Sequence, residues 1–288
     1  MLGGLEIVSN IDQNNNEVNK NDEKKQNKKE ENEGWISSIL IAVVVAVVIR
    51  IFIFAPTVVV GQSMEPTLND LINYKMSDND RLIAERVSYF LNIKPSRGNI
   101  VTFTEPSSEF YIESNPLEKV IKFFGKKDYI KRVIGVEGDH IQFKSDTLRV
   151  DERDQYTNYD IKGNKIYVEG KLLEGNHEIR LENASVYING KRLVEPYTNG
   201  PWDIRSIVLD GQITPNRTQG YDINLDVTVP KGYIYVMGDN RNNSNDSRKF
   251  SPDRNDYLTK DGCISLKEMS GRVIFRFWPI DRIGTIKN

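Results

Sequence analysis

Hydrophobic and polar positions divide the chain into three parts. Residues 1–34 are rich in Asn, Lys and Glu, residues 36–55 are almost entirely apolar, and the remainder alternates between short apolar segments and polar turns. The first part cannot bury enough apolar surface to offset its ordering entropy. We therefore predict that residues 1–34 form a disordered tail.

The apolar run ISSILIAVVVAVVIRIFIFA (36–55) holds three polar side chains, those of Ser37, Ser38 and Arg50. Twenty helical residues span about 30 Å, the thickness of a bilayer's hydrocarbon core. We predict a single transmembrane helix over residues 35–55. One alternative is a cleavable signal peptide, but 34 residues precede the run and no small-x-small site follows it. The other is a buried core helix, in which so uniform a Val and Ile content is rare.

Basic residues near this run predict its orientation. Residues 15–34 carry five lysines, whereas residues 56–75 carry Lys75 alone. The cytoplasmic flanks of membrane helices are enriched in Lys and Arg. The tail is therefore predicted to be cytoplasmic and residues 56–288 to be exported.

Residues 56–288 show the period-two alternation of β-strands. Segments such as NIVTF (99–103), GYIYVMG (232–238) and RVIFRFWP (272–279) are rich in Val, Ile, Tyr and Phe. The predicted fold class is mostly β, with antiparallel sheets. One amphipathic helix is expected over residues 80–91 (DRLIAERVSYFL).

An internal repeat lies within this region. IYVEGKLLEG (166–175) and VYINGKRLVE (186–195) align at a spacing of 20, with Tyr, Gly, Lys and Leu at matching positions. Glu-Gly and Asn-Gly between apolar alternations are hairpin signals. We predict two β-hairpins of similar turn chemistry, because two copies are too few for a solenoid.

The amino-acid composition excludes several classes of protein and of functional site. Lys and Arg minus Asp and Glu is 39 − 41 = −2, which excludes a strongly basic nucleic-acid binder. The single cysteine, Cys263, excludes an internal disulfide and a cysteine-based zinc cluster. His140 and His177 are the two histidines, and the sequence has no nucleotide-binding or HExxH motif. We expect no cofactor and no metal, and chemistry done mostly without histidine.

Ser63 is the first candidate for that chemistry. It follows a predicted strand in VVVGQSMEPTL (58–68), on a turn that Gly61 permits and Pro66 helps to define. By itself this pattern fits either a turn serine or a nucleophile.

The second candidate lies in YIKRVIGVEGD (129–139). Alternation places Lys131 and Arg132 on opposite faces of a strand, so one of them must share a face with apolar neighbours. A lysine in apolar surroundings loses solvation of its charged form, so its pKa falls and it can act as a general base. The alternative is an edge strand with two solvated charges.

The third candidate is the polar run MGDNRNNSNDSRKF (237–250), which follows an apolar strand. It holds more hydrogen-bonding residues than a turn requires, although an exposed turn cluster is the alternative. Asp246 and Arg248 can form an ion pair, and Ser244 can orient a neighbouring group.

Together, four segments resemble the boxes of the type I signal peptidases. GQSMEPTL (61–68) is similar to the nucleophile box, RGNIVTF (97–103) to the second box, KRVIGVEGD (131–139) to the lysine box and GDNRNNSNDSR (238–248) to the last box. They occur in the family's order after a single predicted anchor, and the segment at 271–284 (GRVIFRFWPIDRIG) fits as well. The presence of Lys at 131 resembles the bacterial Ser/Lys branch of the family.

The resemblance implies a role for each matched residue. Ser63 would be the nucleophile, Lys131 the general base, and Ser244 a second serine that hydrogen-bonds the lysine. The scaffold positions of the last box are Asp239, Arg241, Asp246 and Arg248. The pocket-lining positions are Thr57, Val59, Met64, Leu68, Tyr129 and Ile130. Gly61 stands where some members carry a serine of the oxyanion hole, which leaves the second oxyanion donor unidentified.

The resemblance also implies the organisation of the chain. A single N-terminal transmembrane helix would precede an exported antiparallel β-sheet catalytic domain (56–149 and 230–288). A β-rich subdomain with the duplicated hairpins (150–229) would be inserted into that domain.

The implied function is that of a membrane-anchored serine endopeptidase which cleaves signal peptides from exported preproteins, with small residues at −1 and −3. It would cross the plasma membrane of a bacterium once, with a cytoplasmic N-terminus and the catalytic domain on the outer face. Its partners would be signal peptides and the lipid bilayer, and not nucleic acid. The alternatives are a self-cleaving Ser/Lys regulator of the same superfamily and a non-catalytic, membrane-anchored β-rich binding module.

Overall fold

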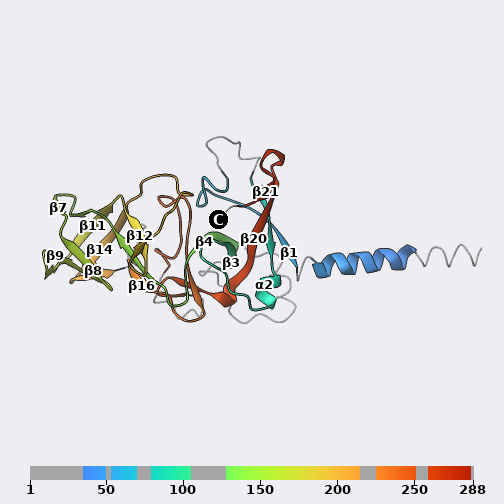
Figure 1. Cartoon of the computed structure of the whole chain (residues 1–288), viewed down its shortest axis with the longest axis horizontal. Coiled ribbons are helices and arrows are strands. Elements are labelled where there is room, and N and C mark those ends of the chain that lie inside the picture. The colour runs from blue at the N-terminus through green and yellow to red at the C-terminus, as the bar shows by residue number, and fades with distance from the viewer. Residues whose placement is uncertain are drawn as a thin grey trace, which may run out of the picture. The chain divides into compact units, whose positions relative to one another are not determined.

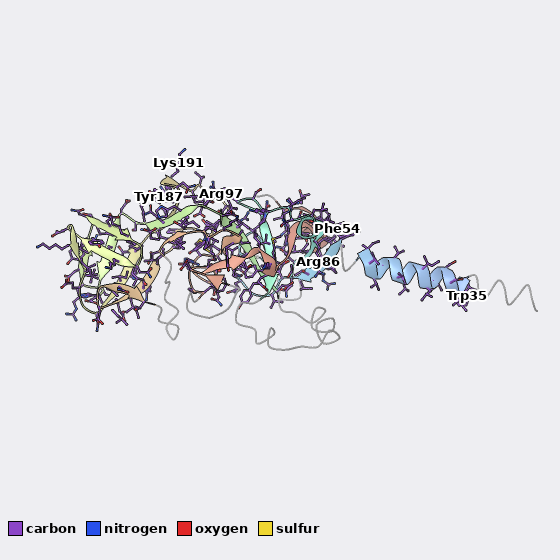
Figure 2. The ribbon with its side chains drawn as sticks, turned by 90° about the horizontal axis from the view of Figure 1, so that it is seen from below. Trp35, Phe54, Arg86, Arg97, Tyr187 and Lys191 are labelled. Atoms are coloured by element: carbon purple, nitrogen blue, oxygen red, sulfur yellow. The ribbon has the colours of Figure 1, made fainter. Side chains whose placement is uncertain are left out.

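A computed structural model describes residues 35–49, 53–69, 79–104, 128–214, 225–250 and 259–286. The chain divides into two compact units, Met1–Ile53 and Phe54–Asn288. In the first unit residues 35–49 are helical, and their side chains are exposed; Figure 2 labels Trp35 on this helix. Within the described residues, no helix has both the length and the apolar character needed to cross a membrane. The predicted span over 35–55 therefore stays a prediction, and the predicted disordered tail (1–34) lies outside the described residues.

The second unit is mostly β, as predicted, and its strands pair in antiparallel fashion. Among the described residues its largest sheet has nine strands, with β1, β2, β20, β3, β4, β17, β19 and β18 in that order and β21 paired with β20. Figure 1 labels β1, β3, β4, β20 and β21 of this sheet. The strands are β1 (Phe54–Val58), β2 (Arg81–Glu85), β3 (Ile100–Thr104), β4 (Asp128–Val136), β17 (Tyr233–Met237), β18 (Thr259–Lys260), β19 (Cys263–Ser265), β20 (Met269–Trp278) and β21 (Gly284–Thr285).

Three smaller sheets follow β4 in the chain. A five-stranded sheet has the order β15-β14-β11-β6-β7, a four-stranded sheet the order β13-β12-β5-β16, and a three-stranded sheet the order β10-β9-β8. Their strands are β5 (His140–Lys144), β6 (Thr147–Val150), β7 (Asp154–Tyr156), β8 (Tyr159–Lys162), β9 (Lys165–Val168), β10 (Lys171–Leu172), β11 (His177–Glu182), β12 (Ser185–Ile188), β13 (Lys191–Arg192), β14 (Ile204–Leu209), β15 (Gln212–Thr214) and β16 (Asp226–Thr228). Short helical turns are α2 (Val87–Phe90), η3 (Leu266–Glu268) and η4 (Ile280–Arg282).

Both copies of the internal repeat form hairpins, as predicted. β9 pairs with β10 around Glu169-Gly170, and β12 pairs with β13 around Asn189-Gly190. All four turn residues have positive φ, between 50° and 80°, as a two-residue type I′ turn requires. The two hairpins belong to different sheets, so the repeat is one of local turn chemistry.

The helix predicted over residues 80–91 is wrong for most of its length. Residues 81–85 form β2, and the helical part is confined to the four residues of α2. Leu82 and Ala84 alternate and are fully buried, and β2 pairs with β1 on one edge and β20 on the other. Pairing on both edges overrides a sequence pattern that fits a helix as well as a strand.

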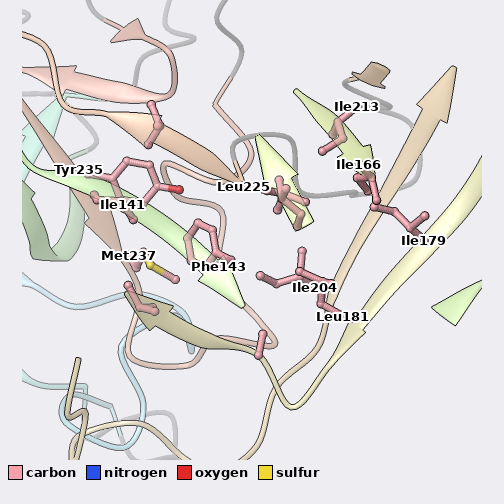
Figure 3. Close-up of a cluster of buried hydrophobic side chains, with 14 of the residues drawn as sticks. Ile141, Phe143, Ile166, Ile179, Leu181, Ile204, Ile213, Leu225, Tyr235 and Met237 are labelled. Carbon is pink, nitrogen blue, oxygen red and sulfur yellow. The ribbon is translucent and has the colours of Figure 1, made fainter. Parts of the chain in front are cut away.

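The largest buried cluster joins the nine-stranded sheet to the smaller sheets. Tyr235 and Met237 of β17 belong to the same cluster as Phe143, Leu181 and Trp202 (Figure 3 labels Tyr235, Met237, Phe143 and Leu181). The boundary predicted between the catalytic part and the inserted residues 150–229 stays a prediction. The packing itself is continuous across it, so the smaller sheets share a core with the strand that leads into the last box.

Candidate active site

The segment that carries Ser63 is closed into a loop by Asn69 and Asp80. Asn69 Nδ2 donates to the carbonyl oxygen of Val59 at 2.9 Å, close to where the segment leaves β1. The Asn69 backbone N–H donates to Asp80 Oδ2 at 3.1 Å, and the Asp80 N–H donates to Asn69 Oδ1 at 2.8 Å. Asp80 is fully buried and forms ion pairs with Arg276 and Arg282, both at 2.9 Å. These contacts therefore fix both ends of the loop that carries Ser63.

Apolar side chains of this loop pack against strands in the middle of the sheet. β1 and β4 are separated by β2, β20 and β3, so the end of β1 is not a neighbour of β4 through strand pairing. Met64 and Leu68 are buried in one cluster with Ile100 of β3 and Ile130 of β4. This packing places the half-buried Ser63 directly against β4.

Ser63 and Lys131 meet there. Lys131 Nζ lies 2.8 Å from Ser63 Oγ and donates to the carbonyl oxygen of Ile130 at 3.0 Å. It also lies 5.2 Å from the centre of the Tyr129 ring. The lysine is 2% exposed, so its amine is almost completely removed from water.

Burial lowers the pKa of Lys131 to about 8, from an ordinary value of 10.5. Desolvation is the main cause, because it disfavours the ammonium form. Asp246 and Asp239 oppose the shift through their negative charges, and Arg248 adds to it. A lysine with this pKa is present as a neutral amine in roughly one molecule in ten at pH 7 and can accept a proton.

Arg132, the other basic residue of this strand, is buried too. Its guanidinium pairs with Asp239 through Nε–Oδ1 at 2.8 Å and Nη2–Oδ2 at 2.7 Å, and it donates to the carbonyl oxygen of Gly98 at 2.9 Å. The strand therefore buries both bases, one as a desolvated amine and one as a two-point ion pair, whereas the sequence pattern required the burial of one.

The last box supplies two more buried arginines. Arg248 pairs with Asp246 through Nε–Oδ1 at 2.9 Å and Nη2–Oδ2 at 3.0 Å, as the sequence suggested. Hydrogen bonds and the Arg248 charge overcome the effect of burial and lower the pKa of Asp246 to about 2. Arg241 instead pairs with Glu195, a residue that the sequence did not single out.

Gly238 brings the last box against the loop that carries Ser63. A Cβ atom at this position would lie 2.3 Å from the carbonyl oxygen of Ser63 and 2.4 Å from Ser244 Oγ, so another residue does not fit without displacement. The Gly238 N–H donates to Asp246 Oδ2 at 3.0 Å, and the Asn240 N–H donates to the Ser63 carbonyl oxygen at 3.1 Å.

Ser244 is close to the site, but the expected hydrogen bond to Lys131 is not among the contacts of the lysine. Its buried hydroxyl has no hydrogen-bond partner of standard geometry within the described residues. The hydroxyl does approach Asp246 closely enough to help lower that carboxyl's pKa. In this state Ser244 packs on Gly238 and acts on Asp246.

The six expected pocket residues fall into two groups. Val59, Met64, Leu68 and Ile130 are at most 7% exposed and form the packed base beneath Ser63. Thr57 and Tyr129 are half-buried.

Gly61 lies two residues before Ser63 with a φ of +89°. Its missing Cβ would have open space, with no atom within 4 Å. The glycine is therefore required by backbone conformation, because L-residues rarely adopt this φ. It supplies no side-chain donor for an oxyanion.

The sequence pattern did not identify five residues that build the site: Asn69, Asp80, Glu195, Tyr197 and Trp202. Asp80 lies at the start of the expected helix. Glu195 is the last residue of the second hairpin copy and Tyr197 follows that copy, and neither has a local pattern of its own. In the described part of the chain, no group of three or more His, Cys, Asp or Glu side chains is arranged to hold a metal ion.

The β-sheet scaffold thus holds a serine hydroxyl against a buried amine, an arrangement that can support nucleophilic catalysis. Residues 32–171 and 173–278 match the family described as "Signal peptidase, peptidase S26". The chain belongs to this family and is a hydrolase that acts on peptide bonds.

Two curated relatives are similar along most of the chain. Signal peptidase IB of Staphylococcus aureus (strain COL) is 29% identical over 249 residues, which cover 85% of this chain and 88% of that protein. Signal peptidase I of Bacillus amyloliquefaciens is 29% identical over 257 residues, which cover 88% and 91%. A crystal structure of a signal peptidase I from Enterococcus faecalis V583 shares 21% identity and a TM-score of 0.29, covering 62% of this chain and 96% of that one.

Proposed function

We propose that this chain is a membrane-anchored serine endopeptidase that removes signal peptides from exported preproteins with a Ser63/Lys131 dyad. The observation that carries the proposal is the 2.8 Å contact between Ser63 Oγ and a lysine amine whose pKa burial lowers to about 8. The similarity to signal peptidases supports the substrate class.

In the first half of the reaction, neutral Lys131 accepts the proton of Ser63 Oγ as the oxygen attacks the scissile carbonyl carbon. The resulting ammonium donates its proton to the leaving amine, and the carbonyl remains bound to Ser63 as an ester. In the second half, Lys131 accepts a proton from a water molecule as the water oxygen attacks the ester carbonyl carbon. The bond between that carbon and Ser63 Oγ then breaks, Lys131 returns the proton to Ser63 Oγ, and the signal peptide leaves with a free carboxylate. One amine thus acts as base and acid in turn.

Oxyanion stabilisation is proposed to begin with the backbone N–H of Ser63. Within the described residues this N–H donates no hydrogen bond, while the Ser63 carbonyl is held by Asn240. A donor aimed at the position where negative charge develops contributes most in a site that excludes water. We propose that the second donor to the oxyanion comes into place only when the substrate binds.

Substrate binding is proposed to occur by strand addition to β1. This strand is the first in the sheet order, so one of its edges has no partner among the described strands. An extended peptide can hydrogen-bond along such an edge. The tight packing of Val59, Met64 and Ile130 leaves little depth beneath the nucleophile, which favours small side chains at −1 and −3.

The apolar run at 36–55, helical over 35–49, is proposed to anchor the enzyme once in the plasma membrane of a bacterium. The lysines that precede it favour a cytoplasmic N-terminus and a catalytic domain on the outer face. An anchor of this kind holds the site near the depth at which a membrane-inserted signal peptide presents its cleavage site.

The test is cleavage of a purified preprotein by the detergent-solubilised full chain. Mass spectrometry should locate a cut that follows a small residue. Ser63→Ala should abolish this cleavage because it removes the hydroxyl, and Lys131→Arg should abolish it because guanidinium stays protonated. A wild-type protein that is folded but cleaves no preprotein would favour the alternative of a non-catalytic binding module. Cleavage confined to the chain itself, seen in its intact mass, would favour the self-cleaving regulator.

A further inference from the structure

The segment between β13 and β14 packs its side chains into the last box, although it lies within the inserted part of the sequence. Glu195, Tyr197 and Trp202 all contact buried arginines. Trp202 is 5% exposed and lies 5.3 Å from the guanidinium carbons of both Arg241 and Arg248. This arrangement is more than a covering loop requires, because each contact ends on a charged group that belongs to the site.

We propose that Glu195 and Tyr197 are positioning residues for Lys131, so that the inserted part of the chain completes the catalytic scaffold. The inference rests on the proposed function, since it assigns these residues to the dyad described above. They act through Arg132 and Arg241, without touching the reacting atoms.

Tyr197 acts on Arg132. The guanidinium carbon of Arg132 lies 4.0 Å from the centre of the Tyr197 ring. A desolvated cation over an aromatic face is held in place by the ring's charge distribution. The Tyr197 hydroxyl donates to Glu195 Oε1 at 3.1 Å, which fixes the ring in turn. Tyr197 thereby keeps Arg132 in its two-point pair with Asp239.

That pair matters to the lysine next to it in β4. The charged groups that act on Lys131 are Asp246 and Asp239, which raise its pKa, and Arg248, which lowers it. The Tyr129 ring faces it from the same strand. If Arg132 loosens, the Asp239 charge is less well neutralised, and it favours the ammonium form of Lys131 more strongly.

Glu195 acts on Arg241. The Arg241 side chain is completely buried, and both of its terminal nitrogens donate to the Glu195 carboxylate, Nη1 to Oε2 at 2.9 Å and Nη2 to Oε1. Arg241 Nε donates to the Gly238 carbonyl oxygen at 3.0 Å, and the Arg241 carbonyl oxygen accepts from Arg248 Nη2 at 2.9 Å. Glu195 thus anchors the turn that holds Gly238 against the loop that carries Ser63.

The first experiment compares Tyr197→Ala with Tyr197→Phe and with a matched control, Tyr187→Ala. Tyr187 also belongs to the inserted part and stacks on a lysine, Lys144, at 5.3 Å, but it contacts no arginine of the last box. Lys131 is titrated by NMR in the full detergent-solubilised chain with ¹³Cε-labelled lysine, and its signal is assigned with Lys131→Met. Preprotein cleavage is followed across the same pH range.

Tyr197→Ala should raise the Lys131 pKa by about half a pH unit or more, whereas Tyr197→Phe and Tyr187→Ala should leave it near the wild-type value of about 8. A rise by one pH unit lowers the neutral fraction at pH 7 about tenfold, and kcat/KM should fall with it. An unchanged titration in folded Tyr197→Ala overturns the inference. The titration needs no substrate, so it tests the inference independently of activity. A wild-type protein that cleaves no preprotein would refute the proposed function, and the titration would still test the role of Tyr197.

If Tyr197→Ala does not fold, Glu195→Gln decides. This variant keeps the shape of the side chain but leaves the buried Arg241 charge unpaired. It should lower kcat about tenfold and leave KM within about twofold of wild type. Its matched control is Glu182→Gln, which removes a carboxylate that pairs with Arg149 and Arg180 in the five-stranded sheet. Equal kcat values for the two glutamine variants would overturn the inference.

Discussion

Replacement of Lys131 by methionine tests the lysine's protonation state without a substrate. Methionine has a similar volume and does not titrate. The wild-type lysine is 2% exposed, so its shifted pKa needs no discount for screening by solvent. We expect Lys131→Met to be inactive and to be most stabilised, relative to wild type, at neutral pH.

The expected size follows from the two pKa values. The difference between 10.5 in the unfolded chain and about 8 in the folded one corresponds to about 3 kcal/mol. Below pH 8 both states bind the proton, and folding must bury the charge. Between pH 8 and 10.5 the unfolded chain binds the proton and the folded chain does not, so wild-type stability rises with pH in that window. The stability advantage of Lys131→Met should therefore shrink by about 3 kcal/mol from pH 7 to pH 10.5.

The assay is urea unfolding of the full chain in a mild non-ionic detergent, followed by tryptophan fluorescence at several pH values. Titrations shared by both proteins cancel in the difference between their unfolding free energies. The control is Lys191→Met, because Lys191 is exposed on β13 (Figure 2). Its difference from wild type should be flat with pH. A flat difference for Lys131→Met as well would show that folding leaves the pKa of Lys131 at its ordinary value of 10.5, and it would refute the role of Lys131 as general base.

Substitutions at three further positions probe the surroundings of the proposed dyad. Gly238→Ala should abolish activity and lower the free energy of unfolding by about 2 kcal/mol or more, because the alanine Cβ would collide with the Ser63 carbonyl oxygen. Activity assays and urea unfolding measure the two effects, and a folded, active variant would contradict the close packing. Gly61→Ser and Gly61→Ala should both lower stability by about 1 kcal/mol and reduce activity, since each meets the same penalty at a φ of +89°; higher kcat in the serine variant alone would reveal a hydroxyl that serves the oxyanion. Ser244→Ala should reduce kcat less than tenfold, because neither hydrogen bond of Lys131 involves Ser244; a far larger loss would mean that the serine engages the amine in the reactive complex.

Local sequence determined much of the fold. Alternating apolar residues predicted the strands, and Glu-Gly and Asn-Gly predicted two hairpins whose turn residues all have the positive φ that those turns need. Both signals are local, because they depend on the two-residue period of a strand and on the conformations open to glycine and asparagine. The resemblance of the ordered boxes to the signal peptidases implied that Ser63 and Lys131, 68 positions apart, are partners, and the two side chains lie 2.8 Å apart.

Tertiary structure decided what those residues became. Residues 81–85 fit a helix or a strand until pairing with β1 and β20 made them β2. Alternation said that one of Lys131 and Arg132 would be buried, but whether each became a neutral amine or a paired cation depended on Ser63, Asp239 and their surroundings. Glu195 and Tyr197 carried no signal in the sequence, because their role lies in arginines that only the fold brings to them. Desolvation and ion pairing depend on what covers a group, and that covering comes from segments far away in the chain.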